Sequence, residues 1–254
     1  MSRIRRSAAR IVPILAASFI AIPGLFAATS ALAEDVGMVN FTLGYKRMST
    51  DWELGTPGVS ASGDTLAPAS ASQPGLGVEL TWGRKGWPAS LAIDVLHSYD
   101  DGMQHFPFIN LGPDTVFAAD ARRRASTLEI GVGLRRSFGL KAWEPYIGAG
   151  GSWVHANVIH EVTDPAQGSY GALISRETGH DSSFGYWVGG GLLKRFGQRF
   201  HLGLTGRYSS AKVDLPSSRV VGESPHYHFT SATSRVDAGG RHIGLVLGWD
   251  FPGR

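Results

Sequence analysis

The sequence predicts an all-β fold, namely an eight-stranded antiparallel up-and-down transmembrane β-barrel. Three observations lead to it: segments of about ten residues in which apolar and polar residues alternate, aromatic residues at the ends of these segments, and connections that alternate between short and long. Alternation with a period of two indicates a strand whose two faces meet different surroundings. A soluble sandwich or a lipocalin-like barrel would show the same alternation with its apolar face inward, so this alternative stays open.

Residues 1–33 have the features of a secretory signal peptide. Four arginines and no acid precede an apolar stretch, and Ala31-Leu32-Ala33 offers a cleavage site. A retained membrane helix is the alternative, because the apolar region is long enough to span a bilayer. Pro13 disfavours such a helix. We therefore expect a mature chain, residues 34–254, that forms one barrel domain.

The charge and the missing cysteines exclude several classes of function. Without the four arginines of the expected signal peptide, the formal net charge falls from +3 to −1, so we expect no nucleic-acid partner. A chain with no cysteine has no disulfide, no thiolate nucleophile and no zinc–thiolate site. The mature part has no further apolar run of about 18 residues, which argues against a transmembrane helix there. In lipid, a chain without such helices can cross only as a closed barrel, because every backbone polar group needs a partner.

The predicted strands are taken in chain order from the alternation. In the clearest segment, residues 76–83, Leu, Val, Leu and Trp occupy one face, and Gly, Glu, Thr and Gly occupy the other. The strands are predicted over residues 39–45, 76–83, 91–95, 127–138, 145–158, 184–196, 200–209 and 242–251. The fifth and sixth segments are rich in glycine and aromatic residues, and the alternation does not decide which of their faces points inward.

The connections between these strands predict the orientation of the barrel. Short connections cover residues 84–88, 139–144 and 197–199, and long ones cover residues 48–74, 100–123, 160–182 and 212–236. Outer-membrane barrels have short periplasmic turns and long extracellular loops. We therefore expect both termini in the periplasm and the long loops outside the cell.

Two segments resemble those of a known group of barrels. One is Pro145-Tyr146-Ile147-Gly148-Ala149-Gly150-Gly151, which opens the fifth strand after a short turn, and the other is the final strand, which ends on aromatic residues. On these segments the chain resembles the small outer-membrane barrels of the OmpA/OmpX/OmpW kind over its whole mature length. The resemblance implies the outer membrane of a Gram-negative bacterium and insertion by the barrel assembly machinery. Such barrels usually finish on the aromatic residue, whereas three residues follow Phe251 here.

Ionisable residues occupy the predicted inward face of several strands: Glu79, Asp94, Glu129, Arg135, Arg207 and His242. An eight-stranded barrel has an interior only wide enough for its own side chains. We interpret the set as a structural network in which buried charges are retained because they are paired. An acid/base catalytic site is the second interpretation, because carboxylates beside Arg or His can have separated pKa values.

A hydrolytic site has one candidate nucleophile, Ser209. The stretch Arg207-Tyr208-Ser209 is similar to the one around the catalytic His-x-Ser of outer-membrane lipid A deacylases. The position of the catalytic base is taken by Arg207, whose guanidinium does not lose its proton at usable pH. The similarity therefore fails at the base.

Histidines near the predicted loops are the candidate metal ligands, namely His105, His180, His226 and His228. His226-Tyr227-His228 places two imidazoles on one side of an extended segment, where they can chelate a divalent ion. Solvated loop histidines are the alternative.

Loop cations, including Arg122-Arg123-Arg124, could contact lipopolysaccharide, because guanidinium groups pair well with phosphate. The alternative is that these side chains form a solvated rim.

Two functions from different classes follow. The first is a non-enzymatic barrel with surface loops and a structural or interaction role in the cell envelope, which needs no cofactor. The second is an enzyme that modifies lipid A at the outer leaflet, either as a deacylase or as an oxidase that depends on a divalent metal.

Overall fold

The computed structural model describes residues 35–47, 72–84, 86–110, 116–139, 142–164, 172–197, 199–221 and 228–251. The expected signal peptide and most of the first long connection lie outside the described residues. His226 also lies outside them.

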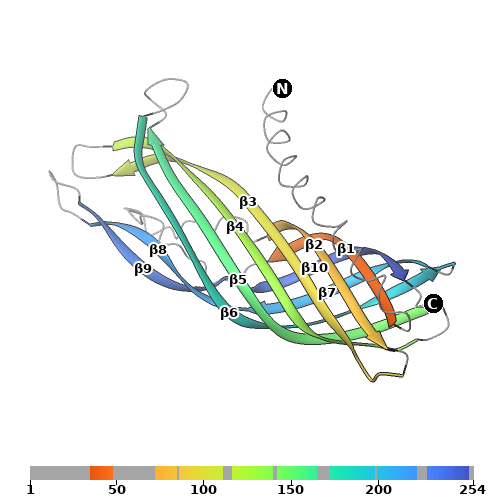
Figure 1. Cartoon of the computed structure of the whole chain (residues 1–254). Helices are drawn as coiled ribbons and strands as arrows, with labels where there is room; N and C mark the ends of the chain where they lie inside the picture. The colour runs from red at the N-terminus through yellow and green to blue at the C-terminus, as the bar shows by residue number, and fades with distance from the viewer. Residues whose placement is uncertain are drawn as a thin grey trace.

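Eight strands close into an antiparallel barrel (Figure 1). They are β1 (Asp35–Arg47), β2 (Ser72–Arg84), β3 (Ser90–Asn110), β4 (Val116–Ser137), β5 (Trp143–Asp164), β6 (Ala172–Phe196), β7 (Phe200–Ser210) and β10 (Gly240–Phe251). Their order is β1-β10-β7-β6-β5-β4-β3-β2, and β1 pairs with β2 to close the ring. β8 (Lys212–Val221) and β9 (His228–Asp237) form a separate two-stranded sheet. The predicted fold class is confirmed. No helix among the described residues is long and apolar enough to cross a membrane.

Four strands are longer than the sequence predicts. β3 and β4 stay paired as far as Asn110↔Val116, and β5 and β6 as far as Asp164↔Ala172. Figure 1 shows these four strands extending well past the ends of their neighbours. The prediction of loops over residues 100–123, 160–182 and 212–236 was therefore wrong for most of these residues. Pairing with a neighbouring strand stabilises the extended conformation there, and the alternation within one segment does not reveal a partner.

The apolar face of the barrel points outward. Leu134, Leu204 and Ile243 are each at least 58 % exposed, whereas Glu129 and Arg135 on the inward face are at most 2 % exposed. A soluble sandwich would bury the apolar face, so this alternative was wrong. The barrel has the inside-out distribution of a protein whose outer surface meets lipid.

The exposed fractions of the side chains also show which face of the fifth and sixth strands, β5 and β6, points inward. In β5, Ile147 faces outward and Tyr146 is buried inside the barrel. In β6, Val188 faces outward and Trp187 is buried. Both strands therefore place a large aromatic side chain in the interior, and the alternation did not reveal this because small glycines stand on both of their faces.

Two rings of aromatic residues border the exposed apolar belt. At the end with the short turns, which we call the turn end, they are Trp82, Trp87, Phe138, Trp143, Phe196, Phe200 and Trp249. At the opposite end, which we call the hairpin end, they are Tyr45, Tyr99, Trp153, Phe184, Tyr186 and Tyr208. Aromatic side chains collect at both interfaces of a membrane-spanning barrel, so the belt between the rings is the surface that a bilayer covers.

The hairpin of β8 and β9 covers the interior at the hairpin end. Its inward side chains pack against those of β4 and β5 in one apolar core, made of Ala125, Val154, Ala156, Val158, Ala211, Val213, Leu215, Val236 and Ala238. The hairpin continues β7 and β10 after a break at Ala211 and at Ala238. The carboxylate of Asp237 holds this break, because Oδ1 accepts hydrogen bonds from the backbone N–H groups of Ala211 and Gly239, both at 2.9 Å. The hairpin is therefore packed against β4 and β5 by an apolar layer.

Candidate functional site inside the barrel

Arg207 on β7 lies at the centre of the inward-facing charges. Its guanidinium donates to Oδ1 of Asp94 on β3 and, at 2.6 Å, to Oε1 of Glu129 on β4. The other oxygen of Glu129 accepts a hydrogen bond from Ser209 Oγ at 2.9 Å and lies 3.7 Å from Nζ of Lys46 on β1. The network therefore ties strands from opposite sides of the barrel together.

Arg135 forms a second group closer to the turn end. It forms an ion pair with Oε1 of Glu79, and the same oxygen accepts a hydrogen bond from Asn40 Nδ2 at 2.8 Å. The guanidinium carbon of Arg135 lies 3.5 Å from the ring centre of Tyr146. Tyr146 in turn donates its hydroxyl to Thr205 Oγ1 at 2.8 Å. Arg135 is thus held by a charge on one side and by an aromatic face on the other.

The charges of the two groups balance. The cations are Lys46, Arg135 and Arg207, and the carboxylates are Glu79, Asp94 and Glu129. Every one of these groups has an opposite charge within 4 Å. This arrangement is what the structural interpretation requires, because a buried charge is tolerated when it is paired and hydrogen-bonded.

Ser209 and Glu129 are poorly placed for hydrolysis. Both are at most 2 % exposed. Both oxygens of Glu129 already accept hydrogen bonds, one from Arg207 and one from Ser209. A general base must be within reach of the proton that it abstracts from a substrate or nucleophile, and Glu129 is enclosed by the barrel. The catalytic interpretation of these residues stays a prediction.

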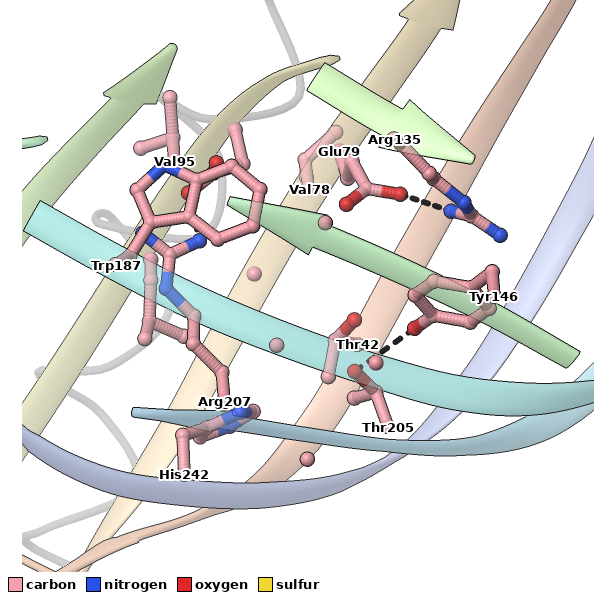
Figure 2. A pocket seen from close by; sticks show the side chains of 17 residues that line it. Thr42, Val78, Glu79, Val95, Arg135, Tyr146, Trp187, Thr205, Arg207 and His242 are labelled. Carbon is pink, nitrogen blue, oxygen red and sulfur yellow. Dashed lines mark hydrogen bonds and ion pairs between the residues drawn. The ribbon is translucent and has the colours of Figure 1, made fainter. Parts of the chain in front are cut away.

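A cavity of about 50 Å³ lies between the two groups. Figure 2 shows Arg207 and Trp187 on one side of it and Arg135 and Tyr146 on another. Sites for small organic ligands have volumes of about 300–1,000 Å³, so this cavity is too small for a lipid or a sugar. Within the described part of the protein, Asp94 Oδ2 and Trp187 Nε1 have no hydrogen-bond partner.

His242 stands apart from the ion pairs. It is 4 % exposed on β10 and lines the cavity. Its Nε2 has no hydrogen-bond partner among the described residues. The sequence predicted that His242 faces inward with the charged residues. The structure places it in the interior, but it takes part in none of the ion pairs of the described strands.

A third polar group, at the turn end, was not predicted from the sequence. His201 on β7 is 1 % exposed; its Nε2 lies 2.6 Å from Asn40 Oδ1 and its Nδ1 lies 3.4 Å from Asp250 Oδ1. Gly248 makes room for this ring, because a Cβ atom there would lie 1.8 Å from Nε2. The alternation in the sequence puts His201, Gly248 and Asp250 on the inward faces of their strands. It does not show that the three are neighbours, which follows only from the pairing Gly248↔His201.

The four candidate metal ligands lie in different parts of the chain. His226 lies outside the described residues. His105 lies on β3 opposite Asp120, and His228 opens β9 opposite Val221, but only their backbones are described. His180 lies on β6 opposite Asn157 with an exposed side chain. The expected loop positions of His105, His180 and His228 were wrong, since all three residues are in strands. Within the described ranges, no group of three or more metal-ligating side chains is present, and metal binding by these candidates stays a prediction.

Comparisons with known proteins return barrels of the same general kind. No protein-family model matches the sequence, and no curated protein matches it. Among solved structures, the chain is similar to outer membrane protein OprG from Pseudomonas aeruginosa, at 13 % identity and a TM-score of 0.44, over 87 % of this chain and 97 % of that one. It is also similar to a major outer membrane protein from Thermus thermophilus, at 11 % identity and a TM-score of 0.45, over 85 % and 98 %. Neisserial surface protein A has 15 % identity and a TM-score of 0.39, over 87 % and 97 %. The barrel architecture rests on the strand pairing of this chain itself.

Proposed function

We propose that the protein is a non-enzymatic barrel of the Gram-negative outer membrane whose hairpin end is extracellular and binds lipopolysaccharide at its lipid-facing edge. The observation that carries the proposal is a cluster of ionisable side chains that face outward directly beyond the aromatic ring of the hairpin end. We call this cluster the outer rim; it consists of Asp101, Arg122, Arg124 and Glu161.

The spacing of outward charges along β4 supports this position. Outward-facing Arg136 and Arg124 stand at opposite ends of an apolar stretch that contains Leu134, Val132 and Ile130. At about 3.3 Å per residue they are about 40 Å apart along the strand, or about 30 Å along the membrane normal at the usual tilt. The hydrocarbon core of a bilayer is also about 30 Å thick. Arg124 therefore stands at headgroup level when Arg136 stands at the other interface.

The outer rim is preorganised by ion pairs between β3, β4 and β5. Arg122 Nε and Nη2 donate to the two oxygens of Asp101 at 2.8 and 2.6 Å. Nε of Arg124 lies 3.8 Å from Oδ2 of Asp101, and Nη2 of Arg124 lies 3.8 Å from Oε2 of Glu161. Hydrogen bonds from Arg122 hold the pKa of Asp101 below its usual range. The carboxylate thus stays ionised and keeps the guanidinium in a fixed orientation.

A fixed guanidinium at headgroup level suits lipid A phosphate. Arg carries five N–H donors in a planar fork, and Asp101 takes only two of those of Arg122. Guanidinium–phosphate contacts are charge-assisted and frequently bidentate.

The test is a lipid A titration of the purified protein in detergent by native mass spectrometry. We expect the double variant Arg122→Gln/Arg124→Gln to lower the affinity for lipid A at least about tenfold, because a hydrogen bond to a charged group contributes about 1.5–3 kcal/mol. Arg136→Gln is the matched control, since Arg136 is an exposed outward arginine at the other membrane interface. Equal losses in the control and in the double variant would show that the outer rim has no specific role.

The same preparations test the alternative function. Mass spectrometry of lipid A from a Gram-negative host that produces the protein would show an acyl loss or an oxygen gain if the chain is a lipid A-modifying enzyme. We expect unchanged lipid A. A mass change that persists in the rim variant but disappears in Ser209→Ala would overturn the non-enzymatic proposal and leave the binding measurement as a separate result.

A further inference from the structure

Two histidines face the outside of the barrel side by side at the hairpin end. The register of β5 and β6 pairs His155 with Ser182 and Asn157 with His180. His155 and His180 are therefore diagonal neighbours on one face of an antiparallel pair, a relation in which long side chains reach each other. Their ring centres are 6.1 Å apart, with an angle of 47° between the ring planes.

His155 is held in one orientation by two neighbours. Its Nδ1 lies 2.8 Å from Ser182 Oγ, and the ring stacks on Trp153 with 5.9 Å between centres and 12° between planes. When Nδ1 donates its hydrogen to Ser182, the lone pair of the neutral imidazole is on Nε2. Metal-binding histidines usually have such a hydrogen bond on the second ring nitrogen, which sets the tautomer and the ring orientation.

The spacing of the rings fits a shared metal ion. Bonds from zinc to imidazole nitrogen are about 2.0–2.1 Å, so two imidazoles on one tetrahedral ion have ring centres about 5 Å apart. The observed separation of 6.1 Å exceeds this by about 1 Å, so metal binding would require the exposed His180 side chain to rotate toward His155.

We propose that His155 and His180 form an open binding site for a divalent transition metal on the outer face of the hairpin end. Imidazole favours Zn²⁺, Cu²⁺ and Ni²⁺, whereas Mg²⁺ and Ca²⁺ prefer oxygen ligands. The nearest carboxylate in sequence, Asp181, is engaged elsewhere, because its oxygens accept from the N–H groups of Ser182 and Asp214, both at 2.7 Å. The remaining coordination positions are therefore open to water or to a ligand from solution.

The site differs from the metal site predicted from the sequence, in which His226 and His228 chelate the ion. His155 was not among the four candidate ligands, whereas its partner His180 was. The pairing of β5 with β6 brings these two residues together although 25 positions separate them in the chain. Among the described residues, His155 and His180 are the two ligands of this site, and no third one is present there.

The test is a Cu²⁺ titration of the purified protein by calorimetry, together with electron paramagnetic resonance to count the nitrogen ligands. Cu²⁺ is the probe because it binds imidazole most tightly among the common divalent ions. We expect one ion with two nitrogen ligands, and at least about a tenfold loss of affinity in either His155→Gln or His180→Gln, given that even a supporting partner of a metal ligand is worth about 10–100-fold. Ser182→Ala should weaken binding by a smaller factor.

Two control variants make the outcome decisive. His97→Gln removes an outward-facing histidine of β3. The double variant His226→Gln/His228→Gln removes two of the metal ligands predicted from the sequence. Both should retain the wild-type affinity and the signal of two nitrogens. Loss of binding in the His226/His228 variant with full binding in His155→Gln would overturn the proposal. Heat-modifiable migration on gels checks that each variant is folded.

Discussion

The membrane-spanning half and the hairpin half of the same strands have opposite arrangements. In the membrane-spanning part of β5, Ile147 faces outward and is 59 % exposed. In the hairpin part, Asn157 faces outward, whereas Ala156 and Val158 face inward and are buried. β4 changes in the same way, from charged Glu129 inside to apolar Ala125 inside. Along these strands the outward face changes from apolar to polar, as expected where the surroundings change from lipid to water.

The two halves are consequently held together by different forces. The membrane-spanning half has a polar interior in which ion pairs and hydrogen bonds connect the strands. The hairpin half has a small apolar core and carries its charges outside. This contrast predicts which substitutions each half tolerates.

The largest effect is expected from Arg207→Met in the polar interior. The substitution leaves Asp94 and the Oε1 atom of Glu129 without the cation that they share. Breaking a buried ion pair at one partner costs about 3–5 kcal/mol, so the free energy of unfolding in a urea titration should fall by about that amount. The exposed Arg241 on β10 provides the control, and Arg241→Met should change the unfolding free energy little. Similar losses in both variants would contradict the contrast between interior and surface charge.

An arginine placed on the outer surface should distinguish the two halves directly. Ile130→Arg puts a charge in the middle of the exposed apolar belt, where the cost is about 2–4 kcal/mol. Asn157→Arg puts the same charge on the outward face near the level of Arg124, at the membrane interface, where the cost falls to about 0–1 kcal/mol. Urea unfolding in lipid vesicles measures both. A cost for Asn157→Arg as large as that for Ile130→Arg would mean that the lipid boundary lies farther along β5.

Leu215→Ala tests the apolar core of the hairpin half. Leu215 is 0 % exposed in the core between β8 and β5, and deletion of a buried leucine side chain costs about 2–3 kcal/mol where neighbours can relax. We expect faster protease cleavage in the hairpin and an unchanged heat-modifiable barrel. Lys212→Ala, on the exposed side of β8, should leave the cleavage rate as it is. If the whole barrel unfolds with the hairpin, the two halves are one cooperative unit.

The smallest effect is a pH dependence at the outer rim. Hydrogen bonds from Arg122 lower the pKa of Asp101, so the folded hairpin end binds this proton less readily than the unfolded chain. The stabilisation is present above the pKa of an unfolded aspartate and is lost as the pH falls through the lowered pKa of the folded state. Because the pair is largely exposed and screened, its contribution is below about 1 kcal/mol. Protection factors from hydrogen exchange of the β3–β4 hairpin, corrected for the intrinsic exchange rate at each pH, should be higher at pH 7 than at pH 3, and this difference should disappear in Arg122→Gln.

Much of the barrel could be predicted from the sequence because lipid imposes a simple rule on it. An outward apolar face and an inward polar face give a period of two, and segments such as residues 76–83 show it without any knowledge of the partner strand. Glu79, Asp94, Glu129, Arg135 and Arg207 were predicted to be inside for the same reason, and all of them take part in interior ion pairs. The alternation could not predict which of these side chains form ion pairs with each other.

The hairpin half was missed for a related reason. Beyond the membrane both faces of a strand meet water or protein, so the alternation is weak and the segments were predicted as loops. The extended conformation of β3 beyond Tyr99 and of β5 beyond Ile159 depends on the neighbouring strand. Pairs such as His155 and His180, or His201 and Asp250, are separated along the chain and meet only through the register.

The sequence by itself determined the fold class, the number of strands in the barrel and the direction in which most side chains point, because each of these follows from local alternation and turn chemistry. Only the tertiary structure decided which charges pair, how far the strands extend and how β8 and β9 pack against β4 and β5. These features depend on strand register and on packing between segments far apart in the chain, and a shift of register by one residue would exchange the two faces of a strand.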